Sequence, residues 1–155
     1  MKAKTDPRHV ARKLALCSVF CWLFSDPDHE ECMRLSSNLL DLEPGDADLD
    51  LTNKIVEGVT NNLKAIDSII QKAAPEWPID KISKIDLVVL RIAIFEIVFG
   101  KSVPEKVAID EAVELAKEFG NDTSSKFVNG VLGSVVSTLK EREKGSESIT
   151  INSLI

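Results

Sequence analysis

The sequence predicts an all-α fold. Apolar residues recur at helical spacing over most of the chain, and residues that start or end helices separate these stretches. No run with the two-residue alternation of a β-strand occurs before residue 144. The 155 residues fit one compact domain or two small subdomains that share a core. With 44% hydrophobic residues the chain can bury such a core, and with 28% charged residues besides it is neither disordered nor fibrous.

Three helices are predicted in the first half of the chain. The first begins at Asp6-Pro7, because aspartate caps a helix and proline suits its first position, and it continues through Phe24. Residues 25–28 break that helix and cap the second, which ends before residues 43–46. A long amphipathic pattern over residues 50–74 predicts a single third helix.

The next predicted helix is the centre of the fold. Ser83, with Asp86 three residues later, is a short-acid variant of the capping box and starts a helix that continues through Phe99. This helix is apolar nearly all round, which is typical of a buried element. Arg91 and Glu96 interrupt the apolar run, and we expect them to form buried structural pairs.

Two further helices complete the predicted fold. One opens at Pro104 and ends at the cap and loop of residues 119–122, and the last covers residues 124–141. Gly130 and Gly133 lower the intrinsic stability of the last helix, which predicts close packing of another helix against them. The predicted core stripe of this helix is Phe127, Val131, Val135 and Leu139.

The charge of the chain is uneven. Nineteen Lys and Arg against 25 Asp and Glu give a net charge of −6, which excludes a uniformly basic surface for nucleic acid. Residues 1–24 carry five basic residues and one acid, a net of +4, whereas residues 25–60 carry ten acids and two basic residues, a net of −8. A basic leader on an acidic chain predicts one local contact with an anion.

The cysteines and the apolar stretches indicate a cytoplasmic protein. Cys17, Cys21 and Cys32 are an odd number with no secretory signal before them, which favours a reducing compartment over a disulfide scaffold. The longest apolar stretch, residues 87–99, is too short and too charged to span a membrane. We therefore expect no membrane partner.

No catalytic constellation is visible in the sequence. It contains no GxSxG, no glycine-rich phosphate loop and no HExxH, so we expect neither an enzyme nor a cofactor. His9 with Cys17, Cys21 and Cys32 is a conceivable zinc set. However, two of these cysteines follow the apolar stripe of the first helix, where cysteine serves as a small core residue. We predict no metal site.

Three motifs in the second half of the chain resemble a known family. Residues 84–97 read KIDLVVLRIAIFEI, residues 107–117 read VAIDEAVELAK and residues 126–132 read KFVNGVL, with Val103-Pro104 and Phe119-Gly120 between them. At this spacing the block closely resembles the NusB family of bacterial transcription antitermination factors. The N-terminal stretch ARKLALCSVFCW also resembles the first helix of that family.

The resemblance implies a compact bundle of about six to seven helices in two packed helical subdomains. It implies one domain over residues 1–143, with subdomains at about 6–74 and 79–143, followed by a tail at 144–155. It also implies that the protein recognises box A of nascent ribosomal RNA, as a single strand, together with the ribosomal protein NusE. That complex joins the RNA polymerase elongation complex and suppresses premature termination.

The resemblance also indicates site residues. Those implied for RNA contact are cations and one ring, which suit phosphates and a stacked base: Arg8, His9, Arg12, Lys117, Phe119 and Lys126. Asp86 and Glu111 match the acidic face that the family offers to its basic ribosomal partner. The run of arginines typical of the leader is thinner here. This leaves open an alternative, a self-associating helical protein such as a homodimer, whose RNA binding is weakened or lost.

Overall fold

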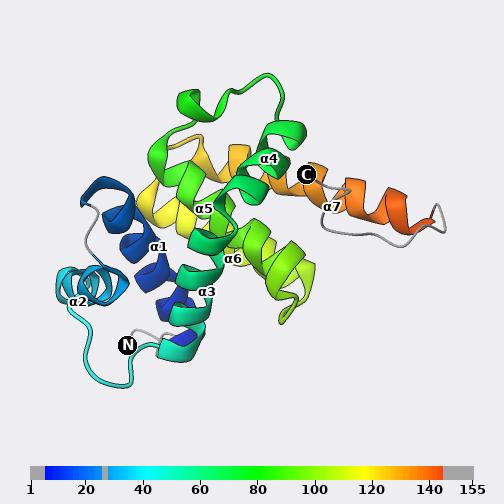
Figure 1. The fold of residues 1–155 in the computed structure, drawn as a ribbon. Coiled ribbons are helices and arrows are strands. Elements are labelled where there is room, and N and C mark those ends of the chain that lie inside the picture. Colours follow the sequence, from blue (N-terminus) through cyan, green and yellow to red (C-terminus); the bar gives the residue numbers. More distant parts are fainter. Residues whose placement is uncertain (1–5, 26–27, 145–155) are drawn as a thin grey trace. The chain divides into compact units, whose positions relative to one another are not determined.

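The structure is a computed structural model that describes residues 6–25 and 28–144. These residues form seven α-helices and no strand, which confirms the predicted all-α class (Figure 1). Residues 1–5 of the basic leader and all of the predicted tail except Lys144 lie outside the described residues. The helices are α1 (Pro7–Ser25), α2 (His29–Leu39), α3 (Leu49–Asn61), α4 (Leu63–Ala73), α5 (Lys84–Ile94), α6 (Glu105–Phe119) and α7 (Ser124–Lys144).

The chain divides after Asn61 into two compact units. Helices α1 to α3 form the N-terminal unit, and α4 to α7 form the C-terminal unit. The resemblance implied subdomains at about residues 6–74 and 79–143, and that division stays a prediction. Helix α4 packs against α5 and α7 within the C-terminal unit.

The helix predicted over residues 50–74 is two helices. The pattern is interrupted at Asn62, whose φ of −117° and ψ of 20° depart from helical values and whose side chain makes no cap hydrogen bond. Asparagine is a poor helix former, and Asn61 and Asn62 stand together at this point. The prediction of one continuous helix was therefore wrong, although the helical residues on both sides of the break were predicted correctly.

The N-terminal unit is held by the apolar surface of α1. Leu14, Ala15 and Val19 of α1 are fully buried, and α2 and α3 both pack against this helix. The start at Pro7 is as predicted, with Asp6 accepting a 2.9 Å hydrogen bond from the Arg8 N–H. The Thr52 hydroxyl donates to the Ala11 carbonyl at 3.0 Å and so ties α3 to α1.

Helix α5 is the centre of the C-terminal unit. Every residue from Asp86 to Ile94 is buried, as the all-round apolar pattern predicts, and α4, α6 and α7 pack on it. The predicted cap is present, since the Ser83 hydroxyl accepts a 3.2 Å hydrogen bond from the Asp86 N–H. Beyond Ile94 the chain continues as a π-helical turn over Phe95–Gly100, in which the buried run ends at Val98.

Arg91 forms a buried ion pair with Asp67 of α4. The guanidinium donates two hydrogen bonds to the two carboxylate oxygens, at 2.8 Å from Nε and 2.9 Å from the terminal nitrogen. The Arg91 side chain is 8% exposed and that of Asp67 is 25% exposed. The expected structural pairing of Arg91 is thus confirmed. Its partner Asp67 was not predicted, because helical spacing does not reveal which helix faces α5.

The structure explains the glycine between α6 and α7 but not the two glycines within α7. A Cβ at Gly120 would lie 2.6 Å from the Cβ of Ser124 and 2.7 Å from the Ala116 carbonyl, so only glycine fits between α6 and α7. Gly130 and Gly133, in contrast, have nothing within 4 Å of an added Cβ among the described residues. The predicted close packing against these two glycines was wrong, and nothing in the structure explains them.

The cysteines lie in the core and on its edge. Cys32 is buried on α2, and Cys17 and Cys21 on α1 are half-buried. Burial of the Cys32 thiol and its hydrogen bond with Cys21 raise the pKa of Cys32 to about 12. Among residues 6–25 and 28–144, no group of three His, Cys, Asp or Glu side chains is placed to hold a metal ion.

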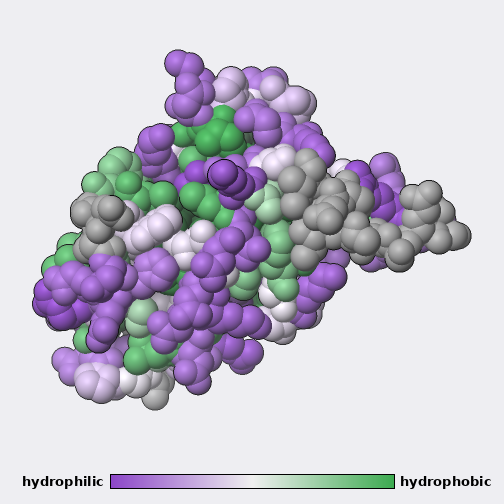
Figure 2. Space-filling view, viewed as in Figure 1, coloured by the Kyte–Doolittle hydropathy of each residue, from purple (hydrophilic) through white to green (hydrophobic). Residues whose placement is uncertain are grey.

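The face of the molecule in Figure 2 is mostly polar. Hydrophilic side chains predominate on the face shown in Figure 2, and apolar residues are scattered among them. The large apolar side chains that remain exposed include Leu39 at 80% and Phe24 at 60%, both in the N-terminal unit. No helix in the described part of the chain is long and apolar enough to cross a membrane.

Candidate functional site

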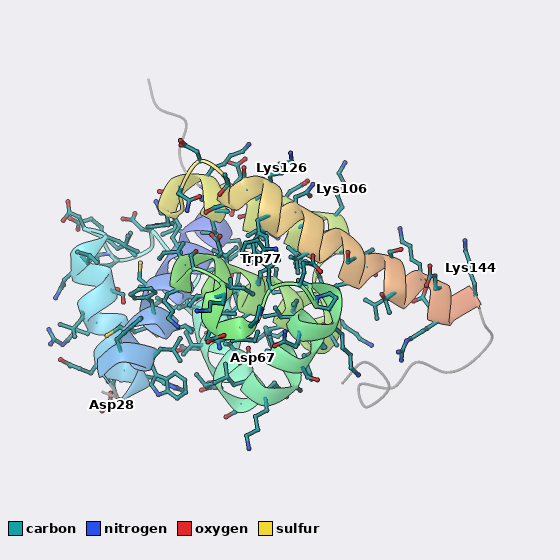
Figure 3. The ribbon with its side chains drawn as sticks, turned by 90° about the horizontal axis from the view of Figure 1, so that it is seen from above. Asp28, Asp67, Trp77, Lys106, Lys126 and Lys144 are labelled. Carbon is teal, nitrogen blue, oxygen red and sulfur yellow. The ribbon has the colours of Figure 1, made fainter. Side chains whose placement is uncertain are left out.

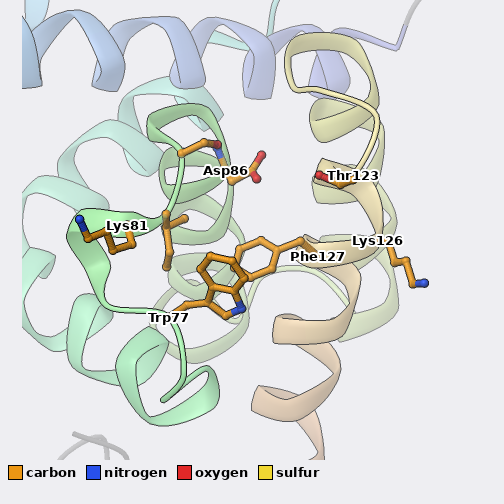
Figure 4. A pocket seen from close by; sticks show the side chains of 8 residues that line it. Trp77, Lys81, Asp86, Thr123, Lys126 and Phe127 are labelled. Carbon is orange, nitrogen blue, oxygen red and sulfur yellow. The ribbon is translucent and has the colours of Figure 1, made fainter.

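The C-terminal unit contains an open groove of about 460 Å³ at the N-terminal ends of α5 and α7. One wall is the loop that follows α4 together with the first turn of α5, and the other is the first turn of α7 (Figure 4). The side chains that give the groove its chemistry are Trp77, Lys81, Ser83, Asp86, Lys126 and Phe127. It therefore combines aromatic, basic and acidic groups from segments about 50 residues apart.

Two aromatic rings line the groove. The centroids of Trp77 and Phe127 are 5.9 Å apart with planes at 75°, an edge-to-face arrangement (Figure 4). Trp77 is 48% exposed, and Phe127 is half-buried. The backbone around Trp77 is held in a turn, since its N–H donates to the Ala74 carbonyl at 3.0 Å and its carbonyl accepts from the Gln71 amide at 3.4 Å. An exposed indole on a fixed turn is available for stacking.

The acidic group of the groove is buried. Asp86 is only 6% exposed, and its Oδ1 has no hydrogen-bond partner among the described residues. The side chain is brought here by the first turn of α5, which Ser83 caps. A buried carboxylate oxygen without a donor is uncommon, and it costs free energy until something donates to it.

Two lysines flank the groove. Lys81, in the short 3₁₀ turn Ile79–Lys81, and Lys126, on the first turn of α7, are both exposed. They extend from opposite edges of the groove (Figure 4). Lys126 stands at the start of α7, far along that helix from Lys144 at its end (Figure 3). Flanking cations and an exposed ring together suit a strand with anionic phosphates and flat bases.

The structure brings two of the predicted site residues into this groove, Asp86 and Lys126. Phe119 is half-buried at the end of α6. Lys117, two residues earlier, carries a 59% exposed side chain that lies 3.5 Å from the Glu114 carboxylate. Glu111, half-buried, lies on the same helix. None of these three α6 residues lines the groove.

The predicted RNA residues of the leader lie on α1. Arg8 is exposed and His9 is half-buried. Arg12 is 3% exposed, and its guanidinium donates to the Arg8 carbonyl at 3.5 Å. A phosphate contact by Arg12 therefore requires its guanidinium to turn outward. Because α1 belongs to the N-terminal unit, the expectation that Arg12 contacts RNA together with Phe119 and Lys126 stays a prediction.

Sequence reasoning missed Trp77, Lys81 and Phe127 as site residues. The sequence did contain a signal for Trp77. This tryptophan lies between Glu76 and Pro78 in a break between helices, so it is not part of the apolar face of a helix, and an exposed ring could have been predicted there. Phe127 had none, because it falls on the apolar stripe of α7 and was interpreted as core. The structure shows that this stripe emerges into the groove at its first residue.

Comparison with known proteins decides the family. The model of the NusB family matches residues 9–137, most of the chain. The chain belongs to the NusB family. Over 142 residues it is 43% identical to the transcription antitermination protein NusB of Roseiflexus castenholzii, which covers 89% of this chain and 97% of that protein. The family consists of antitermination factors and not of enzymes, as the sequence predicted.

Solved NusB structures have the same fold. NusB of T. maritima superimposes with a TM-score of 0.72 at 31% identity, over 86% of this chain and 92% of that chain. A crystal structure of the antitermination factors NusB and NusE in complex with double-stranded RNA superimposes with a TM-score of 0.73 at 25% identity, over 84% of this chain and 96% of that chain.

Proposed function

We propose that this protein is an RNA-binding antitermination factor that recognises box A of nascent ribosomal RNA together with NusE, within the RNA polymerase elongation complex. Membership of the NusB family supports the proposal, and so does the solved relative that carries both NusE and RNA. The observation that carries it in this chain is the groove, where the exposed ring of Trp77 stands beside Phe127 and between Lys81 and Lys126.

Single-stranded RNA matches this arrangement of groups. Each base offers a flat face to an aromatic ring, and stacking of this kind is tolerant of sequence. The phosphates on either side of a stacked base would fall toward the two flanking lysines. Because the chain has a net charge of −6, such binding must be local and must depend on salt.

The test is a titration of fluorescently labelled box A RNA followed by anisotropy, with and without purified NusE. We expect weak binding by this protein alone and tighter binding of the mixture, with affinity falling as salt rises. A scrambled RNA bound as tightly as box A in the presence of NusE would contradict the proposal.

Substituting Lys126 with alanine is expected to weaken the binding of all RNA sequences and to flatten the dependence on salt. Loss of one phosphate contact reduces the log–log slope by about 0.7 for a single strand. The matched control is Lys144→Ala at the other end of α7, which removes the same charge from an exposed position. An equal loss of slope in both variants would show that only net charge matters.

The acidic contact with NusE is also a proposal. Charge reversal by Glu111→Lys on α6 is expected to weaken the complex with NusE, since complementary charge orients and steers a basic partner. Asp110→Lys is the control, because it makes the same change at an exposed neighbour on a different side of the helix. Circular dichroism checks that both variants remain helical. Unchanged affinity for NusE in Glu111→Lys would mean that Glu111 plays no part in docking.

A further inference from the structure

Two free thiols of the N-terminal unit lie in contact where α2 packs on α1. The Cys21 side chain of α1 and the Cys32 side chain of α2 are joined by a hydrogen bond. The rings of Trp22 and His29 also meet between these helices, with centroids 5.6 Å apart in an edge-to-face arrangement. Trp22 directly follows Cys21, and His29 lies three residues before Cys32, so the two contacts are consistent with each other. The packed helices therefore hold the two sulfur atoms close together.

The two thiols differ in how easily a dissolved reagent reaches them. Cys21 is half-buried, whereas Cys32 is completely buried, with an exposed fraction of 0%. Burial and the hydrogen bond with Cys21 raise the pKa of Cys32 to about 12. The Cys32 thiol therefore stays protonated at neutral pH, and a protonated, buried thiol is inert toward dissolved oxidants. Of this pair, Cys21 is the thiol that an oxidant attacks first.

The third cysteine provides an internal comparison. Cys17 is half-buried like Cys21 and lies four residues before it, on the same side of α1. Successive turns of a helix are about 5.4 Å apart, so the two sulfur atoms of α1 lie at different heights along it. Cys17 thus shares the helix and the partial exposure of Cys21 but not its position beside Cys32.

We propose that Cys21 and Cys32 are a redox pair that closes into a disulfide between α1 and α2 when a peroxide is present. Hydrogen peroxide first oxidises Cys21: its O–O bond breaks, one OH bonds to the sulfur, and the other leaves as water with the thiol proton. The Cys32 sulfur then attacks the resulting sulfenic acid. An S–S bond forms, the S–O bond breaks, and the OH leaves as water with the proton of the Cys32 thiol. Overall, the two thiols are oxidised and the peroxide is reduced to water.

This disulfide is reversible and stabilises the N-terminal unit. In the reducing compartment that the sequence predicts, a disulfide is transient, as is typical of redox sensing. The bond closes a short loop of the chain and so restricts the unfolded state. We expect it to raise the melting temperature by about 5–10 °C, and we expect dithiothreitol to return the protein to its original melting temperature.

The test compares the reduced full-length protein before and after treatment with hydrogen peroxide. The remaining thiols are alkylated in denaturant and counted by intact mass spectrometry. We expect a loss of about 2 Da before alkylation and one alkylated thiol in place of three. Cleavage before Asp26 and Asp28 separates Cys32 from the other two cysteines, so the disulfide is detected as a pair of linked peptides.

Single substitutions identify the two sulfur atoms that react. Cys21→Ser and Cys32→Ser should each abolish the disulfide. Cys17→Ser should leave it unchanged and is the matched control, because it makes the same change at a half-buried site on the same helix. Serine at the fully buried position of Cys32 places a hydroxyl in the core, so Cys21→Ser is the decisive variant. The melting temperature of each reduced variant checks that the fold is retained.

Several results would overturn the inference. Peroxide that leaves all thiols open to alkylation, or that adds oxygen to Cys21 without a disulfide, shows that the pair does not close. A disulfide that persists in Cys21→Ser and is lost in Cys17→Ser assigns the reaction to Cys17. A doubled mass shows a bond between two chains. A melting temperature that does not rise shows that the bond does not stabilise the unit. None of these results bears on RNA binding, so the proposed function is tested separately.

Discussion

Replacing Asp67 with alanine should lower the free energy of unfolding by about 3–5 kcal/mol, because the change leaves Arg91 buried and without its partner. For a chain of this length the loss corresponds to a fall in melting temperature on the order of 10 °C. Urea denaturation followed by circular dichroism measures the free energy directly.

A control variant and a double variant test whether the loss of stability comes from the buried ion pair. Arg34→Ala removes one partner of the exposed pair with Glu31, at 2.6 Å, and should change the melting temperature little. The double change Asp67→Leu with Arg91→Met replaces the buried pair with apolar side chains and should recover much of the lost stability. If Asp67→Ala lowers the melting temperature no more than Arg34→Ala does, the buried ion pair does not stabilise the packing of α4 on α5.

Replacing Trp77 with alanine should weaken RNA binding by about 1–3 kcal/mol if a base stacks on the indole. The effect on stability should be small by comparison, because the side chain is half exposed and its contacts include the edge-to-face packing against Phe127. The two quantities are measured on the same variant, by RNA titration at a temperature well below its melting midpoint and by thermal unfolding.

Comparing Phe119→Ala with Trp77→Ala shows on which of the two rings an RNA base stacks. The resemblance to the NusB family assigned stacking to Phe119, whereas the structure presents Trp77 in the groove and Phe119 half-buried at the end of α6. We expect Phe119→Ala to cost mainly stability, by as much as about 3–5 kcal/mol if its site is well packed. A loss of RNA affinity in Phe119→Ala that exceeds the loss in Trp77→Ala would restore the original assignment.

Local sequence signals predicted the helix ends well, since each signal acts within one turn of chain. Asp6 before Pro7 and Ser83 before Asp86 make the hydrogen bonds expected of them. The break at Asn62 was missed because the apolar spacing continues through it, and the spacing alone does not register where the backbone leaves helical geometry.

The sequence by itself determined that this protein is all helical, that α5 is its most buried helix, and that its motifs are those of the NusB family. These properties follow from patterns that are local in the chain or that match a known family. Only the tertiary structure decided that Arg91 pairs with Asp67 and that Trp77, Asp86 and Phe127 line one groove. Helical periodicity tells which side of a helix is apolar but not which helix covers it, and that choice is made when α4, α5 and α7 pack together.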